Sequence, residues 1–421
     1  MSAPSKTTPA LPGTGASPAS APARKRVLFV DDETNILDLF CLMFNPATTP
    51  WDASYATSGK AALALMETQP IDVLVSDMRM PGMNGAELLS EVMERHPMTA
   101  RLILSGYADQ EEVARSVSAA HQFLRKPCDS LKLQSTLNRM CALDVFLDSD
   151  KLKALASKMT IVPSIPGVYF KVMQELESSR SSAESIGEIV AQDPSMTAKL
   201  LQLVNSAFFG ISRKIAHPVE AVQLLGVGTV RSLALTIHAF SCFEQSKMTA
   251  FSVGALWNHS LETGVVARQL TRLAGFDAAL AEESFVAGLL HDLGKLMLAA
   301  NLPQPYGEVL QAANSLAIPL VEAEQRTFQA DHAALGGYLL GLWGLPVSIV
   351  EAVALHHTPR KAATRTFCPL TAVHVANAIQ HARASATDET RALQLDMDYL
   401  AEVGVAEKID GWRSTLACKA A

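Results

Sequence analysis

Cysteine is scarce in this sequence, and its few copies follow no pairing pattern. Six cysteines are spread over 421 residues, and no two of them form a CxxC pair. Scattered cysteines are typical of reduced thiols in the cytosol, whereas disulfide scaffolds place many cysteines in a short chain. We therefore expect a cytoplasmic protein that is held together by hydrophobic cores.

Long hydrophobic runs and dense clusters of basic residues are also missing. The most apolar stretch, Leu224–Phe240, contains Arg231 and is shorter than the roughly 20 apolar residues that a membrane helix needs. The formal net charge is -7, which argues against a surface for nucleic acid. We expect no membrane insertion and no binding of nucleic acid.

The sequence does contain enough apolar residues for more than one core. Hydrophobic residues make up 49% of the 421 residues, a length that suffices for two or three domains. The first 24 residues differ, because Ser, Ala, Pro, Thr and Gly dominate them without periodicity and without the apolar core of a signal peptide. We interpret residues 1–24 as a disordered tail.

Strand and helix patterns alternate over residues 25–144. The expected strands are Val27–Val30, Ala53–Thr57, Val73–Ser76, Arg101–Ser105 and Gln122–Arg125. The expected helices are Glu33–Phe44, Gly59–Glu67, Ala86–Arg95, Gln110–Ala119 and Leu131–Leu147. Five strands that alternate with five helices predict a doubly wound α/β domain with a parallel sheet.

Four of these strands end at polar residues. Asp31 and Asp32 follow the first strand, Asp77 follows the third, Ser105 ends the fourth and Lys126 follows the fifth. Ligands of such sheets bind beyond the carboxyl ends of the strands, near the switch point of the topology. Clustered carboxylates repel one another unless a cation neutralises them. Mg²⁺ is suited to this place, because it favours oxygen ligands and needs few carboxylates besides a phosphate.

The chemistry that fits these residues is attack of a carboxylate on phosphorus, which gives an aspartyl phosphate. Asp77 stands alone after the central strand and is the predicted nucleophile. The predicted metal ligands are Asp31, Asp32, Asp77 and the backbone carbonyl of Arg79. Ser105 can donate a hydrogen bond to a phosphoryl oxygen, and Lys126 supplies a second positive charge. Phe123 is placed to swing inward when Ser105 moves.

The motifs VDDE, SDMRMPGMNG, LILSGYAD and FLRKP resemble the receiver domain of two-component response regulators. The resemblance covers about Arg26–Asp144. It implies that a sensor histidine kinase phosphorylates Asp77 with Mg²⁺ and that Ser105, Phe123 and Lys126 transmit the change. The alternative is a degenerate receiver domain that folds without being phosphorylated.

Residues 145–160 are expected to form a helical linker. Leu143–Met159 has apolar residues at helical spacing with charges between them. This pattern predicts either an extension of the last receiver helix, which could pair two copies as a homodimer, or a surface helix that ends in a short linker.

After Thr160 the strand patterns disappear, and helical periodicities continue to Ala421. Asp193-Pro194-Ser195, for example, predicts the start of a helix, since Pro suits the first turn after an Asp cap. We expect residues 161–421 to form an all-α domain with its core in residues 161–359.

Several histidines of this domain fall on or at the ends of apolar helices. The candidates for a metal site are His259, His291, Asp292, His332, His356 and His357. Imidazole and carboxylate groups on neighbouring helices can form a binuclear metal site. The competing interpretation is a set of hydrogen-bonded core histidines. His217, His238 and His374 match no ligand position and are interpreted as core or surface residues.

The HDLGK motif resembles the HD superfamily of metal-dependent phosphohydrolases, but Asn377 stands where that pattern has an Asp. A larger set of motifs, among them VPSIPGVYFKVMQEL, WNHS and LWGLPVSIVEAVALHH, is similar to the HDOD output domain. That resemblance covers about Ile161–Pro359 and implies a signalling or scaffolding module that binds a downstream protein without hydrolysis. The stretch after His357 also lacks the GYP motif of cyclic-di-GMP phosphodiesterases. A phosphorylation-regulated, metal-dependent phosphodiesterase of that type is the alternative.

Overall fold

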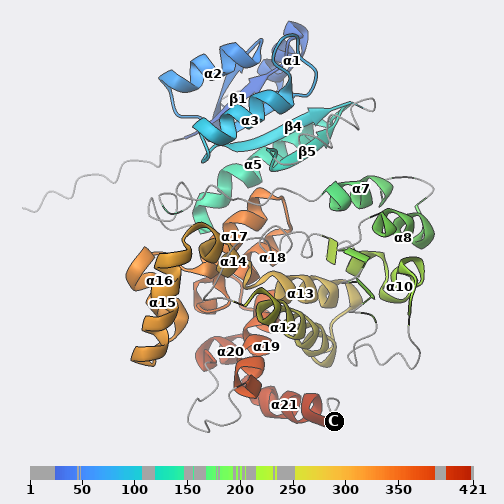
Figure 1. Cartoon of the computed structure of the whole chain (residues 1–421), viewed down its shortest axis with the longest axis vertical. Helices are drawn as coiled ribbons and strands as arrows, with labels where there is room; N and C mark the ends of the chain where they lie inside the picture. The colour runs from blue at the N-terminus through green and yellow to red at the C-terminus, as the bar shows by residue number, and fades with distance from the viewer. Residues whose placement is uncertain are drawn as a thin grey trace, which may run out of the picture.

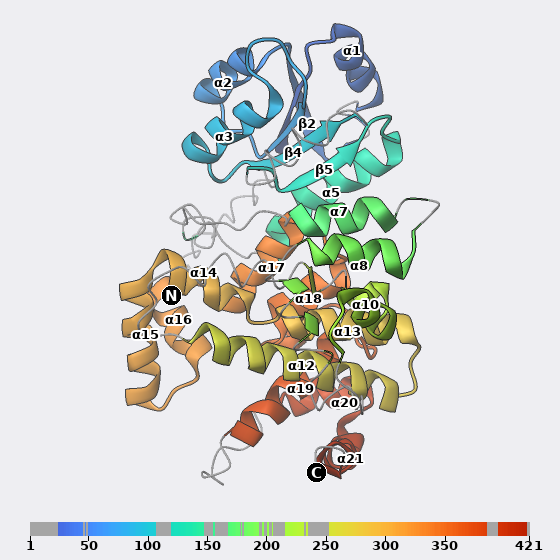
Figure 2. The ribbon, with the colours of Figure 1, turned by 45° about the vertical axis from the view of Figure 1, so that its right-hand side comes forward.

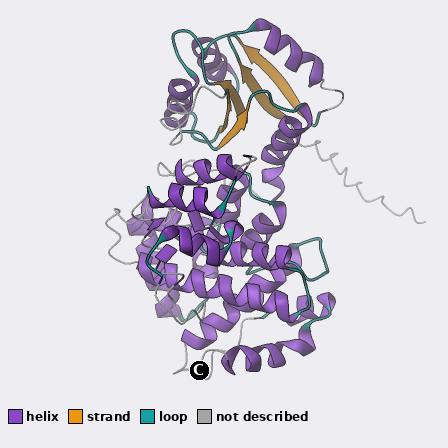
Figure 3. Cartoon of the chain, turned by 90° about the vertical axis from the view of Figure 1, so that its right-hand side faces the viewer, coloured by secondary structure: helices purple, strands orange, loops and turns teal. Residues whose placement is uncertain are grey.

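The structure is a computed structural model in which two parts of different architecture follow each other along the chain (Figure 1). It describes residues 24–44, 47, 49–106, 119–146, 155, 167–176, 178, 181–192, 196–197, 200–201, 204, 215–230, 233–234, 252–384 and 395–418. All strands in these residues belong to the N-terminal part (Figure 3). The predicted fold class, a doubly wound α/β domain followed by an all-α domain, is confirmed.

The N-terminal part is a five-stranded parallel sheet. Its strands are β1 (Lys25–Val30), β2 (Trp51–Ala56), β3 (Val73–Asp77), β4 (Ala100–Ser105) and β5 (Gln122–Arg125), in the order β2-β1-β3-β4-β5. All four pairings are parallel. The order reverses between β1 and β3, so the ends of these two strands flank the place where such sheets bind ligands.

Helices cover both faces of this sheet. They are α1 (Thr34–Met43), α2 (Gly59–Thr68), α3 (Gly85–Arg95) and α5 (Ser130–Phe146). One core contains buried residues of α1 and α5, and the other contains buried residues of α2 and α3. Most of the predicted helix Gln110–Ala119 lies outside the described residues, as does nearly all of the predicted linker 145–160.

The second strand begins two residues earlier than the sequence predicted. Trp51 is fully buried, and its ring lies 5.4 Å from that of Phe44 and 6.1 Å from that of Phe29. Its indole N–H donates a hydrogen bond to Asn138 Oδ1 in α5. The burial of a large aromatic side chain between two helices extends the strand, and the weak alternation of Ala53–Thr57 does not indicate this.

The C-terminal part consists of helices around one continuous core. The first are α7 (Gly167–Leu176), α8 (Ala183–Ala191) and α10 (Pro218–Leu225). Then follow α12 (Val253–Leu273), α13 (Ala278–Leu290), α14 (Leu293–Asn301), α15 (Pro303–Leu316), α16 (Leu320–Phe328), α17 (His332–Leu342) and α18 (Val347–Leu355). The last are α19 (Pro369–Ala384), α20 (Met397–Val403) and α21 (Ile409–Cys418). The predicted helix start at Asp193 lies outside the described residues.

Close packing of α12 and α13 forms the centre of this bundle. Asp277 caps α13 by accepting a hydrogen bond from the Leu280 N–H. Gly264 and Gly288 face each other, and a Cβ on Gly288 would lie only 2.6 Å from the Cα of Gly264. The two backbones can therefore touch, which brings His259 of α12 close to His291 at the end of α13. No helix among the described residues is both long and apolar enough to cross a membrane.

Candidate functional sites

The first candidate site lies at the carboxyl edge of the sheet, where β1, β3 and β5 end. Asp31 follows β1 and Asp77 ends β3, and these two strands pair directly. The ammonium of Lys126, just after β5, lies 2.8 Å from Asp31 Oδ2 and also contacts Asp77. Asp31 is 2% exposed and the Asp77 side chain 13%. A partly buried cation therefore bridges two carboxylates from neighbouring strands.

Burial and charge act in opposite directions on Asp77. Burial raises the pKa of this carboxyl, while Lys126 and the Arg79 backbone N–H, 2.7 Å from Oδ2, oppose the rise without cancelling it. Burial lowers the pKa of Lys126, but its hydrogen bonds to Asp31 and Asp77 outweigh this and raise the pKa overall. Lys126 thus stays charged, and its positive charge offsets part of the negative charge of the two carboxylates.

Of the remaining predicted residues, Ser105, Asp32 and Arg79 lie at the same edge of the sheet, and Phe123 lies further back in β5, three residues before Lys126. Ser105 ends β4, is buried, and its backbone carbonyl accepts a hydrogen bond from the Lys126 N–H at 2.7 Å. Phe123 in β5 is half-buried and packs against the core between the sheet, α2 and α3. Asp32 is exposed beside Asp31. The backbone N–H of Arg79 donates a hydrogen bond to Asp77.

Gly85 is a residue of this site that the sequence analysis did not identify. A Cβ at this position would collide with the Asp77 carbonyl oxygen and lie 3.0 Å from Met78 Cα. Its N–H donates a hydrogen bond to the Met78 carbonyl at 2.9 Å. Asn84 and Glu87 form a capping box at the start of α3. The MNG motif therefore anchors α3 directly against the backbone of Asp77.

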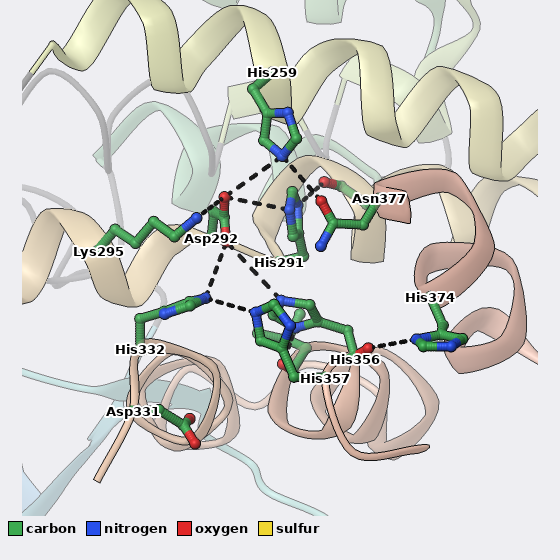
Figure 4. A network of polar contacts seen from close by, with 12 residues as sticks. His259, His291, Asp292, Lys295, Asp331, His332, His356, His357, His374 and Asn377 are labelled. Carbon is green, nitrogen blue, oxygen red and sulfur yellow. Dashed lines mark hydrogen bonds and ion pairs between the residues drawn. The ribbon is translucent and has the colours of Figure 1, made fainter. Parts of the chain in front are cut away.

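The second candidate site is a group of histidines around Asp292 in the C-terminal part (Figure 4). His259 comes from α12, His291 ends α13, Asp292 precedes α14, His332 begins α17, and His356 and His357 follow α18. All six predicted residues meet in one place, although the chain separates them by up to 98 positions. Four helix ends converge there.

Asp292 lies between two groups of imidazoles. Its Oδ2 atom is 3.3 Å from His291 Nε2 and 3.6 Å from His259 Nε2. Its Oδ1 atom is 3.2 Å from His332 Nε2 and 3.9 Å from His356 Nε2. Two sets of three residues bring their ligand atoms within 4.8 Å of one another, namely His259, His291, Asp292 and His332, His356, His357. This spacing is compatible with one or two cations.

Hydrogen bonds to the Nδ1 atoms orient three of these rings. His291 and His356 each donate from Nδ1 to the carbonyl three residues earlier, at 2.7 and 2.8 Å. His332 Nδ1 lies 2.6 Å from Glu324 Oε2 of α16. The Nε2 atoms are therefore directed at Asp292, in the way that outer carbonyl and carboxylate groups orient metal-binding histidines.

The residues present fit a divalent metal ion. Six buried side-chain atoms lack a hydrogen-bond partner within the described part of the chain, and three of them belong to this group: His291 Nε2, Asp292 Oδ1 and His356 Nε2. Buried polar atoms are rarely left unpaired, and imidazole with carboxylate is a ligand set for Zn²⁺, Mn²⁺ or Fe²⁺. Lys295 would compete with a metal ion for Asp292, because its Nζ atom lies 2.6 Å from Asp292 Oδ2.

The protonation states of the residues around Asp292 also suit the binding of a metal ion. Burial lowers the pKa of His259 to about 3 and keeps the pKa values of His356 and His357 well below the usual range. Burial opposes ionisation of Asp292, yet His291 and Lys295 hold the pKa of Asp292 well below its usual value. His259, His356 and His357 are therefore neutral imidazoles near a carboxylate, the forms that bind metals.

His332 is the exception among these histidines. Burial lowers its pKa, but Glu324 outweighs that effect and raises the pKa to about 9. Glu324 is itself fully buried, and it accepts hydrogen bonds from the His332 backbone N–H at 2.9 Å and from the Tyr306 hydroxyl at 3.1 Å. A buried carboxylate therefore fixes both the position and the charge of His332.

Sequence reasoning did not identify Glu324, Lys295 or His381 as part of this site. The His381 ring lies 4.9 Å from that of His259. Asn377, noted for its missing carboxylate, places Oδ1 3.0 Å from His259 Nε2. The Lys295 position could have been found from the HDLGK motif, since residues three apart face each other on a helix.

His374, interpreted as a core or surface residue, is buried behind the site. Its Nδ1 donates to the His356 carbonyl at 2.7 Å, and its Nε2 accepts from the Asp396 N–H at 2.9 Å. His217 is the exposed N-cap of α10. His238 lies outside the described residues.

Comparison with known proteins identifies both parts of the chain. The response regulator receiver domain model matches residues 27–138, and the HDOD domain model matches residues 162–359. An HDOD domain protein of unknown function from Geobacter sulfurreducens has the same fold over 65% of this chain and 97% of that chain, with a TM-score of 0.52 and 20% identity.

Curated relatives resemble only parts of the chain. An uncharacterized protein of Treponema pallidum is 26% identical over 226 residues, which are 53% of this chain and 43% of that protein. The hydrogenase transcriptional regulatory protein HoxA of Cupriavidus necator is 38% identical over 103 residues, which are 24% of this chain and 21% of that protein. Each match thus spans less than half of the relative.

Proposed function

The chain joins a response regulator receiver domain to an HDOD domain, and from this premise we propose that a sensor histidine kinase phosphorylates Asp77 and thereby switches the HDOD domain. The observation that carries the proposal is the cluster of Asp31, Asp77 and Lys126 at the ends of three strands. Asp31, Asp32, Asp77 and the Arg79 carbonyl would hold Mg²⁺, which would neutralise charge on the incoming phosphoryl group.

The residues of the chain then have separate roles in the transfer. The Asp77 carboxylate attacks phosphorus, and the bond between phosphorus and the donor breaks as the new oxygen–phosphorus bond forms. Lys126 keeps its charge and moves its pairing from the carboxylates to the phosphoryl oxygens. Ser105 donates a hydrogen bond to one of these oxygens, and Phe123 follows the movement of Ser105.

The output that we propose is protein binding in the cytoplasm. The HDOD domain, with its core in residues 161–359, acts as a signalling scaffold for a downstream protein, and residues 145–160 link it to the receiver domain. The net charge of -7 agrees with a partner other than nucleic acid.

Labelling with acetyl phosphate tests whether Asp77 accepts a phosphoryl group. We expect one phosphoryl group per chain in the presence of Mg²⁺, and none in Asp77→Asn. Asp52→Asn is the matched control, because Asp52 lies in β2 and pairs with Arg24 away from the site. A receiver domain that stays unlabelled in the unsubstituted chain, with the fold intact, contradicts the proposal.

A second candidate function is a metal-dependent phosphodiesterase acting on a cyclic dinucleotide. The unpaired Nε2 atoms around Asp292 favour it. A bound metal would supply an activated water and polarise a phosphoryl oxygen. Asn377 argues against it, because a neutral amide stands beside His259 where a carboxylate is expected. Scaffolding therefore remains the first proposal.

Metal analysis and a hydrolysis assay separate the two functions. We expect the purified full-length chain to bind a divalent metal and to leave cyclic-di-GMP intact. The matched control is His291→Ala, which should lose the metal. Turnover of the dinucleotide that disappears in His291→Ala would make the enzyme the better proposal.

A further inference from the structure

Helix α17 reaches into the cores of both domains. Leu342, its last residue, is buried with side chains of β4, β5 and α5 in a core of the receiver domain. Tyr338, one turn earlier, packs against this core and against the HDOD core. Figures 1 and 2 show α17 beside α5 at the junction of the two parts. A side chain of the HDOD domain thus completes the receiver core.

A buried hydrogen bond fixes this contact. Gln122, the first residue of β5, is buried, and its Nε2 donates to the Leu342 carbonyl oxygen at 2.9 Å. The last carbonyls of a helix lack intrahelical partners, so the receiver domain supplies one here. Gly344 has φ +77, and a Cβ on it would lie 3.0 Å from the Gln122 side-chain amide. The turn after α17 is therefore built around Gln122.

The opposite end of α17 carries His332 of the histidine site. In the middle of the helix, Gly336 approaches the backbone of Gly294 in α14. Gly337 approaches α18 so closely that a Cβ would lie 2.6 Å from the Ala354 Cβ. α14 begins directly after Asp292, and α18 ends directly before His356. Such close contacts transmit displacement, because no long, flexible side chain lies between the helices to absorb it.

We propose that α17 couples the two domains: it locks them together while Asp77 is unphosphorylated, and phosphorylation loosens the Gln122–Leu342 contact and shifts His332 relative to Asp292. β5 connects the two events, since Gln122 begins it and Lys126, which contacts Asp77, follows its end. This coupling rests on the proposed phosphorylation of Asp77. Coupling is reciprocal, so weakening the lock also favours phosphorylation.

Hydrogen exchange of the full chain, with and without beryllium fluoride as a mimic of the aspartyl phosphate, tests the coupling. We expect amides of residues 332–345 to exchange roughly five- to 150-fold faster with the mimic, the range of typical coupling. Gln122→Ala and Gln122→Leu should show faster exchange without it and faster labelling by acetyl phosphate. Gln69→Ala, in the loop after α2, is the matched control and should behave as the unsubstituted chain.

Each outcome has a distinct meaning. If fluorine NMR shows beryllium fluoride on Asp77 while exchange in residues 332–345 stays the same, the coupling is wrong and the phosphorylation proposal stands. If Asp77 takes neither the mimic nor a phosphoryl group, the proposed function fails, and the coupling to Asp77 fails with it. If both Gln122 variants fold and exchange at the unsubstituted rate, the lock is wrong whatever happens at Asp77.

Discussion

Replacing Gly294 by alanine should separate two helices that form the histidine site. Gly294 lies in the first turn of α14, two residues after Asp292, and faces the first turn of α17. A Cβ there would lie 2.8 Å from the His332 carbonyl carbon, closer still to its oxygen, and 3.0 Å from the Gly336 nitrogen. All three atoms are backbone, so no side-chain rotation relieves the overlap.

The size of the effect follows from these distances. Carbon atoms in contact stand roughly 3.5–4.0 Å apart, so α14 and α17 must separate by about 1 Å. Overpacking of a tight core costs about 1–3 kcal/mol and occasionally more, and a backbone clash belongs at the upper end. Alanine in place of glycine stabilises a helix by about 1 kcal/mol, which offsets part of this cost. We expect a net loss of about 2 kcal/mol or more in the free energy of unfolding.

Urea unfolding followed by tryptophan fluorescence measures this loss, since Trp343 is buried just after α17. The control is Gly411→Ala in α21, where a Cβ meets nothing within 4 Å and the same helix preference should stabilise the chain by up to about 1 kcal/mol. Calorimetric titration with Zn²⁺ should also show weaker binding in Gly294→Ala. Stability and Zn²⁺ affinity equal to those of the unsubstituted chain would refute the argument.

Three further predictions concern charge. Lys295→Met removes the cation from Asp292 Oδ2, so calorimetry should show divalent metal binding roughly tenfold tighter, about 1.4 kcal/mol; weaker binding would mean that Lys295 supports the site. Asn377→Asp adds a carboxylate beside His259, and we expect a similar gain in affinity, with Asn314→Asp as the control. Burial keeps the pKa of His121 well below 6.5. As the pH falls, the unfolded chain therefore binds a proton at this residue that the folded chain does not, and acid destabilises the fold. From pH 7.5 to 5.5 this group alone should lower the free energy of unfolding by about 1.4 kcal/mol, a loss absent from urea unfolding of His121→Gln.

Local patterns were sufficient for much of the receiver site. A strand that ends at Asp77 places this carboxylate at the edge of the sheet, and the same holds for Asp31 and Lys126. Parallel pairing then brings the strand ends together without further information. Gly85 was missed because its role depends on the approach of α3 to the Asp77 carbonyl, and helical periodicity carries no signal for such an approach.

Contacts between helices explain what the sequence could not predict in the HDOD domain. Glu324 sits on a helix of otherwise mixed charge, and only packing shows that this carboxylate is fully buried against His332. Only the tertiary structure likewise shows that the His381 ring lies beside that of His259. A helical pattern indicates which face of one helix is apolar, but not which face of which other helix it meets.

The sequence by itself determined the order of the two domains, the strand-end residues of the receiver and the set of histidines in the HDOD domain, because these depend on short-range pattern. Only the tertiary structure decided that these candidate residues meet and that Lys295 competes for Asp292. It also decided that Leu342 enters the receiver core. Gln122 and Leu342 lie 220 positions apart, and a contact across that distance exists only when both domains are folded and docked.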